Sequence, residues 1–146
     1  MWQSKSLKYM GKKISNRRST CPVSNVLDLL GDKWTLIVLR DMLLFGKKLF
    51  KELAESTEGI PTNILADRLK RLELAGLLTK EAYQSNPPRY AYHLTLKGMD
   101  LFPVLKEIIV WGAKYLTGIR SRDPNFLKDL EKQVSAKKAG MLKSGR

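Results

Sequence analysis

Hydrophobic residues recur three or four positions apart along most of this chain, which is the spacing of one face of an α-helix. The spacing predicts helices over residues 22–30 and about 33–45, followed by a short helix over about 49–55. Gly31 is expected to end the first helix, and Asp32 is expected to cap the second. Because the second helix is apolar over a broad stripe, we expect it to be central and largely buried.

The stretch from Leu49 to Gly76 has the pattern of two helices joined by a tight turn. Gly59 suits the turn, since glycine adopts positive φ at little steric cost. Pro61 and Thr62 mark the start of the second helix, where the Thr62 hydroxyl is expected to cap free backbone N–H groups. One face of this helix is apolar and consists of Leu65, Leu69 and Leu72. A small-residue turn between two helices, the second polar on its outer face, predicts a helix-turn-helix with residues 62–71 in a DNA major groove.

Alternation of apolar and polar residues replaces the helical spacing directly after Gly76. It predicts strands over residues 77–83 and 89–94, joined by a turn over 84–88 in which neither proline pairs in the sheet. A hairpin that follows a helix-turn-helix defines a winged helix. The pattern therefore predicts a mainly α protein with a small β-hairpin wing.

Helical spacing returns after the hairpin, with Thr95 as a candidate cap. Pro103 is expected to divide the segment into a short turn and a long helix that reaches about residue 116. The long helix is apolar on more than one side, so we expect it to bury part of its surface against a second copy of the chain. Asp123 begins a last helical stretch, and residues 136–146 are expected to trail away without structure.

Basic residues outnumber acidic ones by 27 to 14, which gives a formal net charge of +13. Six basic and no acidic residues lie in residues 1–20, and eight basic and three acidic residues lie in residues 117–146. The remainder, 21–116, holds thirteen basic and eleven acidic residues. We therefore predict a basic N-terminal arm over 1–20, a nearly balanced domain over 21–116 and a basic, partly helical C-terminal extension over 117–146. Such charge favours an acidic partner but does not select DNA by itself.

Cys21 is the only cysteine, so an intramolecular disulfide is excluded. No apolar run approaches the length of a membrane span, and no secretory signal is visible, which predicts a cytoplasmic protein that does not bind a membrane. The basic, Ser-containing start of the chain fits a solvated arm better than a transit peptide.

An ordered set of residues over about 21–116 carries a family resemblance. The set consists of Cys21-Pro22-Val23, Leu27, Leu30-Gly31-Asp32-Lys33-Trp34, Gly59-Ile60, Leu65, Leu69, Leu72-Glu73, Ala75-Gly76-Leu77, Pro87-Pro88-Arg89, Tyr92, Leu94-Thr95, Gly98, Pro103-Val104-Leu105 and Trp111. On these residues the chain resembles the HxlR-type winged helix-turn-helix family of bacterial transcription regulators.

The resemblance implies a homodimeric DNA-binding regulator with a three-helix core and N- and C-terminal dimerisation helices. It also implies that the cysteine at position 21 senses oxidants or electrophiles in some members. One departure concerns the start of the recognition helix, where many members have Ser and this chain has Pro61. The capping role is then expected to pass to Thr62.

Several residues of the predicted recognition helix and its surroundings are candidates for DNA contact. Asn63 suits bidentate pairing with adenine, and Lys70 or Arg71 suits guanine or phosphate. Arg68 is nearer the core side, so we expect a phosphate contact, while Asp67 would repel phosphate unless it orients a neighbour. The remaining candidates are Thr62 at the helix start, Arg89 after the wing turn and Lys51 on the preceding helix. The alternative for each of them is an ordinary solvated side chain.

Cys21 is predicted to lie at a helix start near Arg17 and Arg18, which favours a reactive thiolate. The alternative is that Cys21 is a small buried apolar residue.

His93 is the only histidine, so a metal site supplied by the protein is not expected. The sequence contains no Gly-rich phosphate loop and no nucleophile triad, so we expect neither an enzyme nor a cofactor.

These observations predict a homodimer that binds double-stranded DNA at a palindromic operator. Whether a small molecule or a redox signal acting through Cys21 controls the binding stays open. Two other functions remain open. One is a winged-helix protein-interaction module, and the other is non-specific nucleic-acid binding driven by the basic tails.

Overall fold

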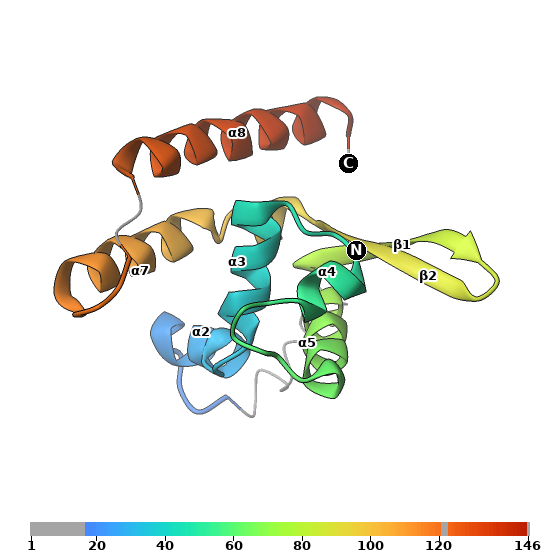
Figure 1. Cartoon of the computed structure of the whole chain (residues 1–146), viewed down its shortest axis with the longest axis horizontal. Helices are drawn as coiled ribbons and strands as arrows, with labels where there is room; N and C mark the ends of the chain where they lie inside the picture. The colour runs from blue at the N-terminus through green and yellow to red at the C-terminus, as the bar shows by residue number, and fades with distance from the viewer. Residues whose placement is uncertain (1–16, 121–122, 146) are drawn as a thin grey trace. The chain divides into compact units, whose positions relative to one another are not determined.

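Helices make up most of the structure, a computed structural model that describes residues 17–120 and 123–145 (Figure 1). The chain divides into two units, the first ending at Thr95 and the second beginning at Leu96. In the first unit the elements are α2 (Pro22–Leu30), α3 (Thr35–Phe45), α4 (Phe50–Ala54), α5 (Thr62–Leu74), β1 (Leu78–Ser85) and β2 (Pro88–Leu94). In the second they are α6 (Leu96–Met99), α7 (Phe102–Tyr115) and α8 (Pro124–Lys143). Most of the predicted arm at 1–20 lies outside the described residues, and the predicted domain boundaries stay predictions.

The core of the first unit consists of leucine-rich stripes on α3, α4 and α5. Leu39 on α3 and Leu65 on α5 are both 0% exposed, and Leu53 on α4 is 1% exposed. α3 is largely buried, as its pattern predicted, and α4 and α5 both contact it. Asp32 accepts hydrogen bonds from the backbone N–H groups of Trp34 and Thr35 at 2.9 and 3.0 Å, so it caps α3 as predicted.

The turn between α4 and α5 follows the expected helix-turn-helix plan, with Gly59 at a φ of +70°. The start of α5 differs from the prediction. Pro61 is the N-cap residue and makes no side-chain cap, and Thr62 is the first helical residue. The Thr62 hydroxyl therefore does not cap the helix, because Thr62 is not at the N-cap position and its side chain makes no hydrogen bond within the described residues.

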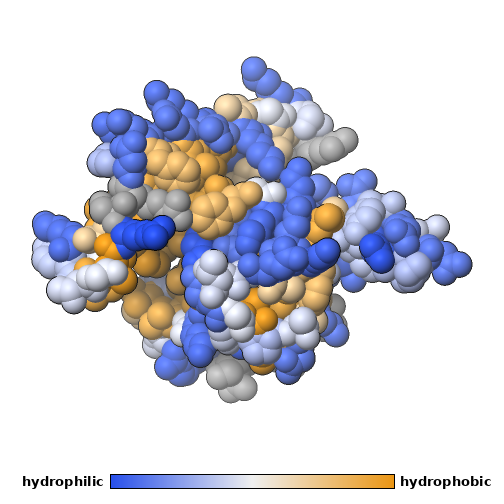
Figure 2. Space-filling view, in the orientation of Figure 1, coloured by the Kyte–Doolittle hydropathy of each residue, from blue (hydrophilic) through white to orange (hydrophobic). Residues whose placement is uncertain are grey.

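β1 and β2 form an antiparallel hairpin that projects from the helices of this unit and carries a mostly hydrophilic surface (Figures 1 and 2). Ser85 pairs with Pro88, so the turn holds only Asn86 and Pro87. The prediction that neither proline would pair in the sheet is wrong for Pro88. A proline is tolerated there because it is the first residue of an exposed edge strand, where no ladder N–H is needed.

The base of the hairpin is attached to the helix-turn-helix by backbone pairing. The Tyr92 N–H donates to the Lys48 carbonyl at 2.8 Å, and Leu49 forms a β-bridge with Ala91. The Thr95 hydroxyl donates to the Gly76 carbonyl at 2.6 Å. The wing is therefore fixed at its base to the residues that enter α4 and leave α5.

The second unit consists of a short turn of helix followed by two long helices. Pro103 lies in the first turn of α7, as expected from a proline that divides a helical segment. The Asp123 carboxylate accepts from the Asn125 N–H at 2.9 Å and caps α8. α8 continues to Lys143, so the prediction of an unstructured tail from residue 136 is wrong. Contacts within the unit explain the extra length, because Lys138 of α8 pairs with Asp100.

Candidate nucleic-acid interface

The polar face of α5 is the central feature of the first unit. Leu65, Leu69 and Leu72 are at most 1% exposed, which fixes the rotation of the helix about its axis. The opposite side consequently faces outward, and it carries the exposed side chains Thr62, Asn63, Ala66, Asp67, Lys70 and Arg71. Among the described residues, Asn63, Lys70 and Arg71 have no side-chain hydrogen bond or ion pair. Their polar groups are therefore available to an external partner.

Arg68 differs from these residues because its guanidinium is held by two carboxylates. Its Nε donates to Asp32 Oδ1 at 2.9 Å, and its Nη1 pairs with Asp67. The side chain is 16% exposed, and the bond to Asp32 raises the pKa of the arginine. Burial alone would raise the pKa of Asp32, but hydrogen bonds from Thr35 and Arg68 hold it well below its ordinary range. Arg68 thus connects α5 to the start of α3, and Asp67 orients it.

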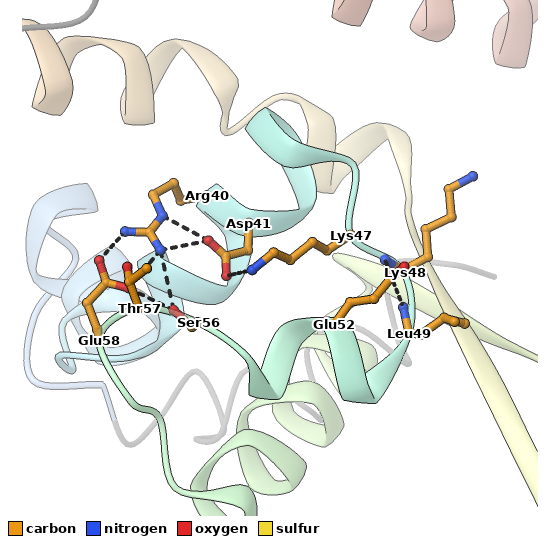
Figure 3. Close-up of polar contacts among 9 residues, drawn as sticks. All are labelled: Arg40, Asp41, Lys47, Lys48, Leu49, Glu52, Ser56, Thr57 and Glu58. Carbon is orange, nitrogen blue, oxygen red and sulfur yellow. Dashed lines mark hydrogen bonds and ion pairs between the residues drawn. The ribbon is translucent and has the colours of Figure 1, made fainter.

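A second polar cluster fixes the turn before α5 (Figure 3). Asp41 is 1% exposed and accepts from Arg40 at 2.7 Å and from Lys47 at 3.0 Å. Arg40 also donates to both oxygens of Glu58, at 2.5 and 2.8 Å, and the Ser56 hydroxyl donates to Glu58 at 2.7 Å. Glu58 lies in the turn, so this cluster holds the turn against α3.

The charge of this cluster is stabilised by its own geometry. The Arg40 hydrogen bonds lower the pKa of Glu58 well below its ordinary value, and those to Glu58 raise the pKa of Arg40. Sequence reasoning missed this cluster. The available signal was the pair Arg40-Asp41 inside an otherwise apolar helix, since charges at such positions are buried only when they are paired.

Two further candidates lie outside α5. Lys51 is exposed on α4, and the Glu52 carboxylate beside it accepts from the Lys48 and Leu49 N–H groups at 2.8 and 3.0 Å and caps that helix. Arg89 is exposed and pairs with Gln84 in the register of the hairpin, as the second residue after the turn. Neither Lys51 nor Arg89 has an ion-pair partner in the described part of the chain. The structure thus leaves cations free on α4, α5 and the wing of one unit.

Cys21 is exposed and immediately precedes α2. Its carbonyl accepts from the Asn25 N–H at 3.1 Å and from the Asn25 side chain at 2.8 Å. Arg18, expected near the thiol, instead pairs with Asp28 at 2.7 Å. The Cys21 side chain is therefore not buried within this unit.

Several exposed apolar side chains lie together on α2 in the first unit and on α7 in the second. On α2, Val23, Val26 and Leu27 are 67%, 46% and 55% exposed. On α7, one stripe consists of Val104, Ile108, Trp111 and Tyr115, all of them exposed. Contiguous apolar surface of this kind marks an association site more often than a solvated face.

Residues 17–120 and 123–145 contain neither a candidate metal site nor a candidate membrane-spanning helix. In that part of the chain, no group of three or more His, Cys, Asp or Glu residues could hold a metal ion. None of its helices combines the length and the apolar character that crossing a bilayer requires. His93 pairs loosely with Glu81, with 3.6 Å between Nε2 and Oε2.

Comparisons with known proteins identify relatives that contain a helix-turn-helix. The family model described as HxlR-like helix-turn-helix matches residues 29–120. The HTH-type transcriptional regulator Rv3095 of Mycobacterium tuberculosis is 39% identical over 103 residues, which are 70% of this chain and 64% of that relative's length. The solved structure of PA1607 has a TM-score of 0.63 at 35% identity and covers 75% of each chain. The redox regulator HypR in its reduced form has a TM-score of 0.59 at 34% identity, covering 64% of this chain and 92% of HypR.

Proposed function

This chain belongs to the HxlR-like helix-turn-helix family, and from that membership we propose that it is a sequence-specific DNA-binding regulator of transcription. The winged-helix fold predicted from the sequence is confirmed by the helical structure with its two-stranded hairpin and by the similarity to PA1607 and HypR. The observation that carries the proposal is α5, whose apolar stripe is fully buried while its outer face presents unpaired polar groups. Such a helix suits the width of a major groove.

The candidate residues other than Thr62 divide into three roles in this proposal. Asn63 reads a base edge, and Lys70 and Arg71 contact guanine or phosphate, because their side chains have no partner within the described chain. Lys51 and Arg89 supply phosphate or minor-groove contacts beside the helix. Arg68 acts as a positioning residue that fixes α5 through Asp32, in place of the phosphate contact expected from sequence alone.

Homodimerisation is the second part of the proposal. The exposed apolar residues of α2 and of α7 would be covered by a second copy, which also matches the implication of the family resemblance. Two recognition helices would then enter successive major grooves of a palindromic operator, about 34–36 Å apart. The nucleoid lies in the cytoplasm of bacteria, which is where the protein would act.

Competition binding by fluorescence anisotropy tests the proposal, using an operator selected from random DNA. Asn63→Ala should cost about 1–3 kcal/mol and relax the preference at one base pair. Lys51→Ala should weaken all sequences alike and reduce the salt slope by about one. Equal affinity for selected and random DNA would contradict sequence-specific binding. Loss of all binding on removing residues 1–20 and 120–146 would instead support attraction by the basic tails, and retention of partner proteins without DNA would support an interaction module.

Redox control through Cys21 is a second candidate function. The thiol is exposed at a helix start, and the similar protein HypR is a redox regulator. Oxidation would join two copies through Cys21 or form an adduct on the thiol, and it would change DNA affinity. Non-reducing electrophoresis and anisotropy after peroxide treatment measure both effects, and a Cys21→Ser variant that responds like the wild type would refute the idea.

A further inference from the structure

A cavity of about 410 Å³ lies between α7 and α8 in the second unit. Its apolar part includes Ile109 and Ala113 of α7 and Leu127 of α8. Three lysines also line it, and these are Lys106, Lys114 and Lys128. The volume is in the range of pockets that hold small organic molecules, and the combination of an apolar lining with a few charges is typical of them.

The charged side chains that line this cavity are all basic. None of the described residues that line it is acidic. Lys106 is paired with Glu131 at 2.8 Å and so joins α7 to α8. Lys128 has no hydrogen-bond or ion-pair partner in the described chain, and the Lys114 ammonium lies 5.0 Å from the ring centroid of its neighbour Tyr115. Two cations therefore lie beside an apolar cavity without a carboxylate to neutralise them.

The cavity uses a different face of α7 from the exposed apolar stripe. The stripe follows the spacing of Val104, Ile108, Trp111 and Tyr115, whereas the cavity is lined at positions 106, 109, 110, 113 and 114. A second copy docked on the stripe would leave the α8 side of the helix unoccupied. α8 also lies beyond residue 120, where the match to the family ends, so the cavity depends on the C-terminal extension of this chain.

From the apolar lining and the unneutralised lysines we propose that this cavity binds a small amphipathic anion, a molecule with an apolar body and a single carboxylate. The apolar body would lie against Ile109, Ala113 and Leu127, and the carboxylate would pair with Lys128. Binding requires neither DNA nor the dimer, so the outcome is independent of the function proposed above.

Isothermal titration calorimetry on the full chain, without DNA, tests the ligand class with two probes that share the same naphthalene ring. The probe 2-naphthoate carries the carboxylate, and 2-naphthol is uncharged at neutral pH. We expect 2-naphthoate to bind one site per chain and 2-naphthol to bind about tenfold more weakly, because 2-naphthol has no negative charge to pair with Lys128.

Matched variants locate the site. Lys128→Gln should weaken 2-naphthoate about fivefold and leave 2-naphthol unchanged, since only a partly exposed charge pair is lost. Lys132→Gln is the control, because Lys132 is an exposed lysine of the same helix that does not line the cavity. Ala113→Leu places extra volume in the cavity and should abolish binding of both probes, with circular dichroism confirming that the helices are retained.

Any one of four results would overturn the proposal. One is the absence of 2-naphthoate binding at millimolar concentration. Another is equal affinity for the two probes, which would indicate a merely apolar surface. The other two are an equal loss from the Lys128 and Lys132 variants and no loss from Ala113→Leu in a folded protein, since either would place the ligand elsewhere.

Discussion

α5 and α2 both carry an apolar stripe, yet only α5 buries it inside its unit. On α5 the stripe residues Leu65 and Leu69 are 0% and 1% exposed, whereas Leu27 on α2 is 55% exposed. The two stripes look equivalent in the sequence, because periodicity reports which residues share a face and not what covers that face. In α5 the apolar face fixes the helix in the core and leaves a polar face outside, while on α2 only Leu30 of the apolar face is buried and Val23, Val26 and Leu27 are exposed.

The same contrast holds for the polar contacts near the two helices. Asp41, in the cluster that holds the turn before α5, is 1% exposed and has two cationic partners. Asp28 on α2 pairs with Arg18, and the two side chains are 36% and 59% exposed. Exposed ion pairs contribute little because water already solvates them, whereas a buried carboxylate depends on its partners. α5 is therefore positioned by its own unit, and the outer face of α2 is free for association.

The largest expected effect comes from a matched pair of leucine truncations. Leu65→Ala should lower the free energy of unfolding by about 2–5 kcal/mol, because it creates a cavity in a fully buried stripe. Leu27→Ala should change the unfolding of the single chain by less than about 0.5 kcal/mol. Urea unfolding measured over a range of protein concentrations separates the two effects.

If α2 is covered by a second copy, Leu27→Ala should lower the free energy of unfolding only at protein concentrations at which the wild type is a dimer. Analytical ultracentrifugation should then show that the variant dimer is weaker than the wild-type dimer. The Leu65→Ala loss should persist at every concentration. A large decrease in the free energy of unfolding of Leu27→Ala at every protein concentration would mean that Leu27 is buried within the single chain. α2 would then not differ from α5 in what covers its apolar stripe.

The next effect concerns the two aspartates. Asp41→Ala should destabilise the fold by about 3 kcal/mol, because Arg40 and Lys47 would lose a buried partner. Asp28→Ala is the control and should cost less than about 1 kcal/mol. Equal losses from the two variants would show that the cluster at Asp41 does not hold the turn more firmly than a surface pair holds α2.

Sequence reasoning identified the elements well wherever one local pattern determined them. Pro22 begins α2 and Leu30 ends it as predicted, and the leucine stripe of α5 is buried as predicted. It was wrong about the Thr62 cap and about Pro88, since both depend on the backbone conformation of one residue. It also ended the last helix too early, because α8 is stabilised by partners distant in sequence, such as Asp100 for Lys138.

The candidate interface was predictable in its location and less so in its residue roles. The exposed face of α5 follows from helical spacing alone, so Asn63 and Lys70 could be chosen without a structure. Arg68 was predicted to contact phosphate because the sequence shows its charge but does not show which carboxylates pair with it. Asp32 lies 36 residues away in the chain, and no periodicity reports such a pairing.

The smallest expected effect is the acid sensitivity that Glu58 gives to the turn before α5. Arg40 lowers the pKa of Glu58 well below its ordinary value of 4.5 in the folded state. A carboxylate with a lowered folded pKa stabilises the fold above its unfolded pKa, and this contribution is lost as the pH falls through the folded pKa. The free energy of unfolding should therefore decrease as the pH is lowered from about 5 towards 2. Glu58→Gln should make this decrease shallower without removing it, because hydrogen bonds also lower the pKa of Asp32 at the start of α3. Urea unfolding of both proteins across that range measures the two slopes, and identical slopes would mean that the bonds from Arg40 to Glu58 do not hold the turn in solution.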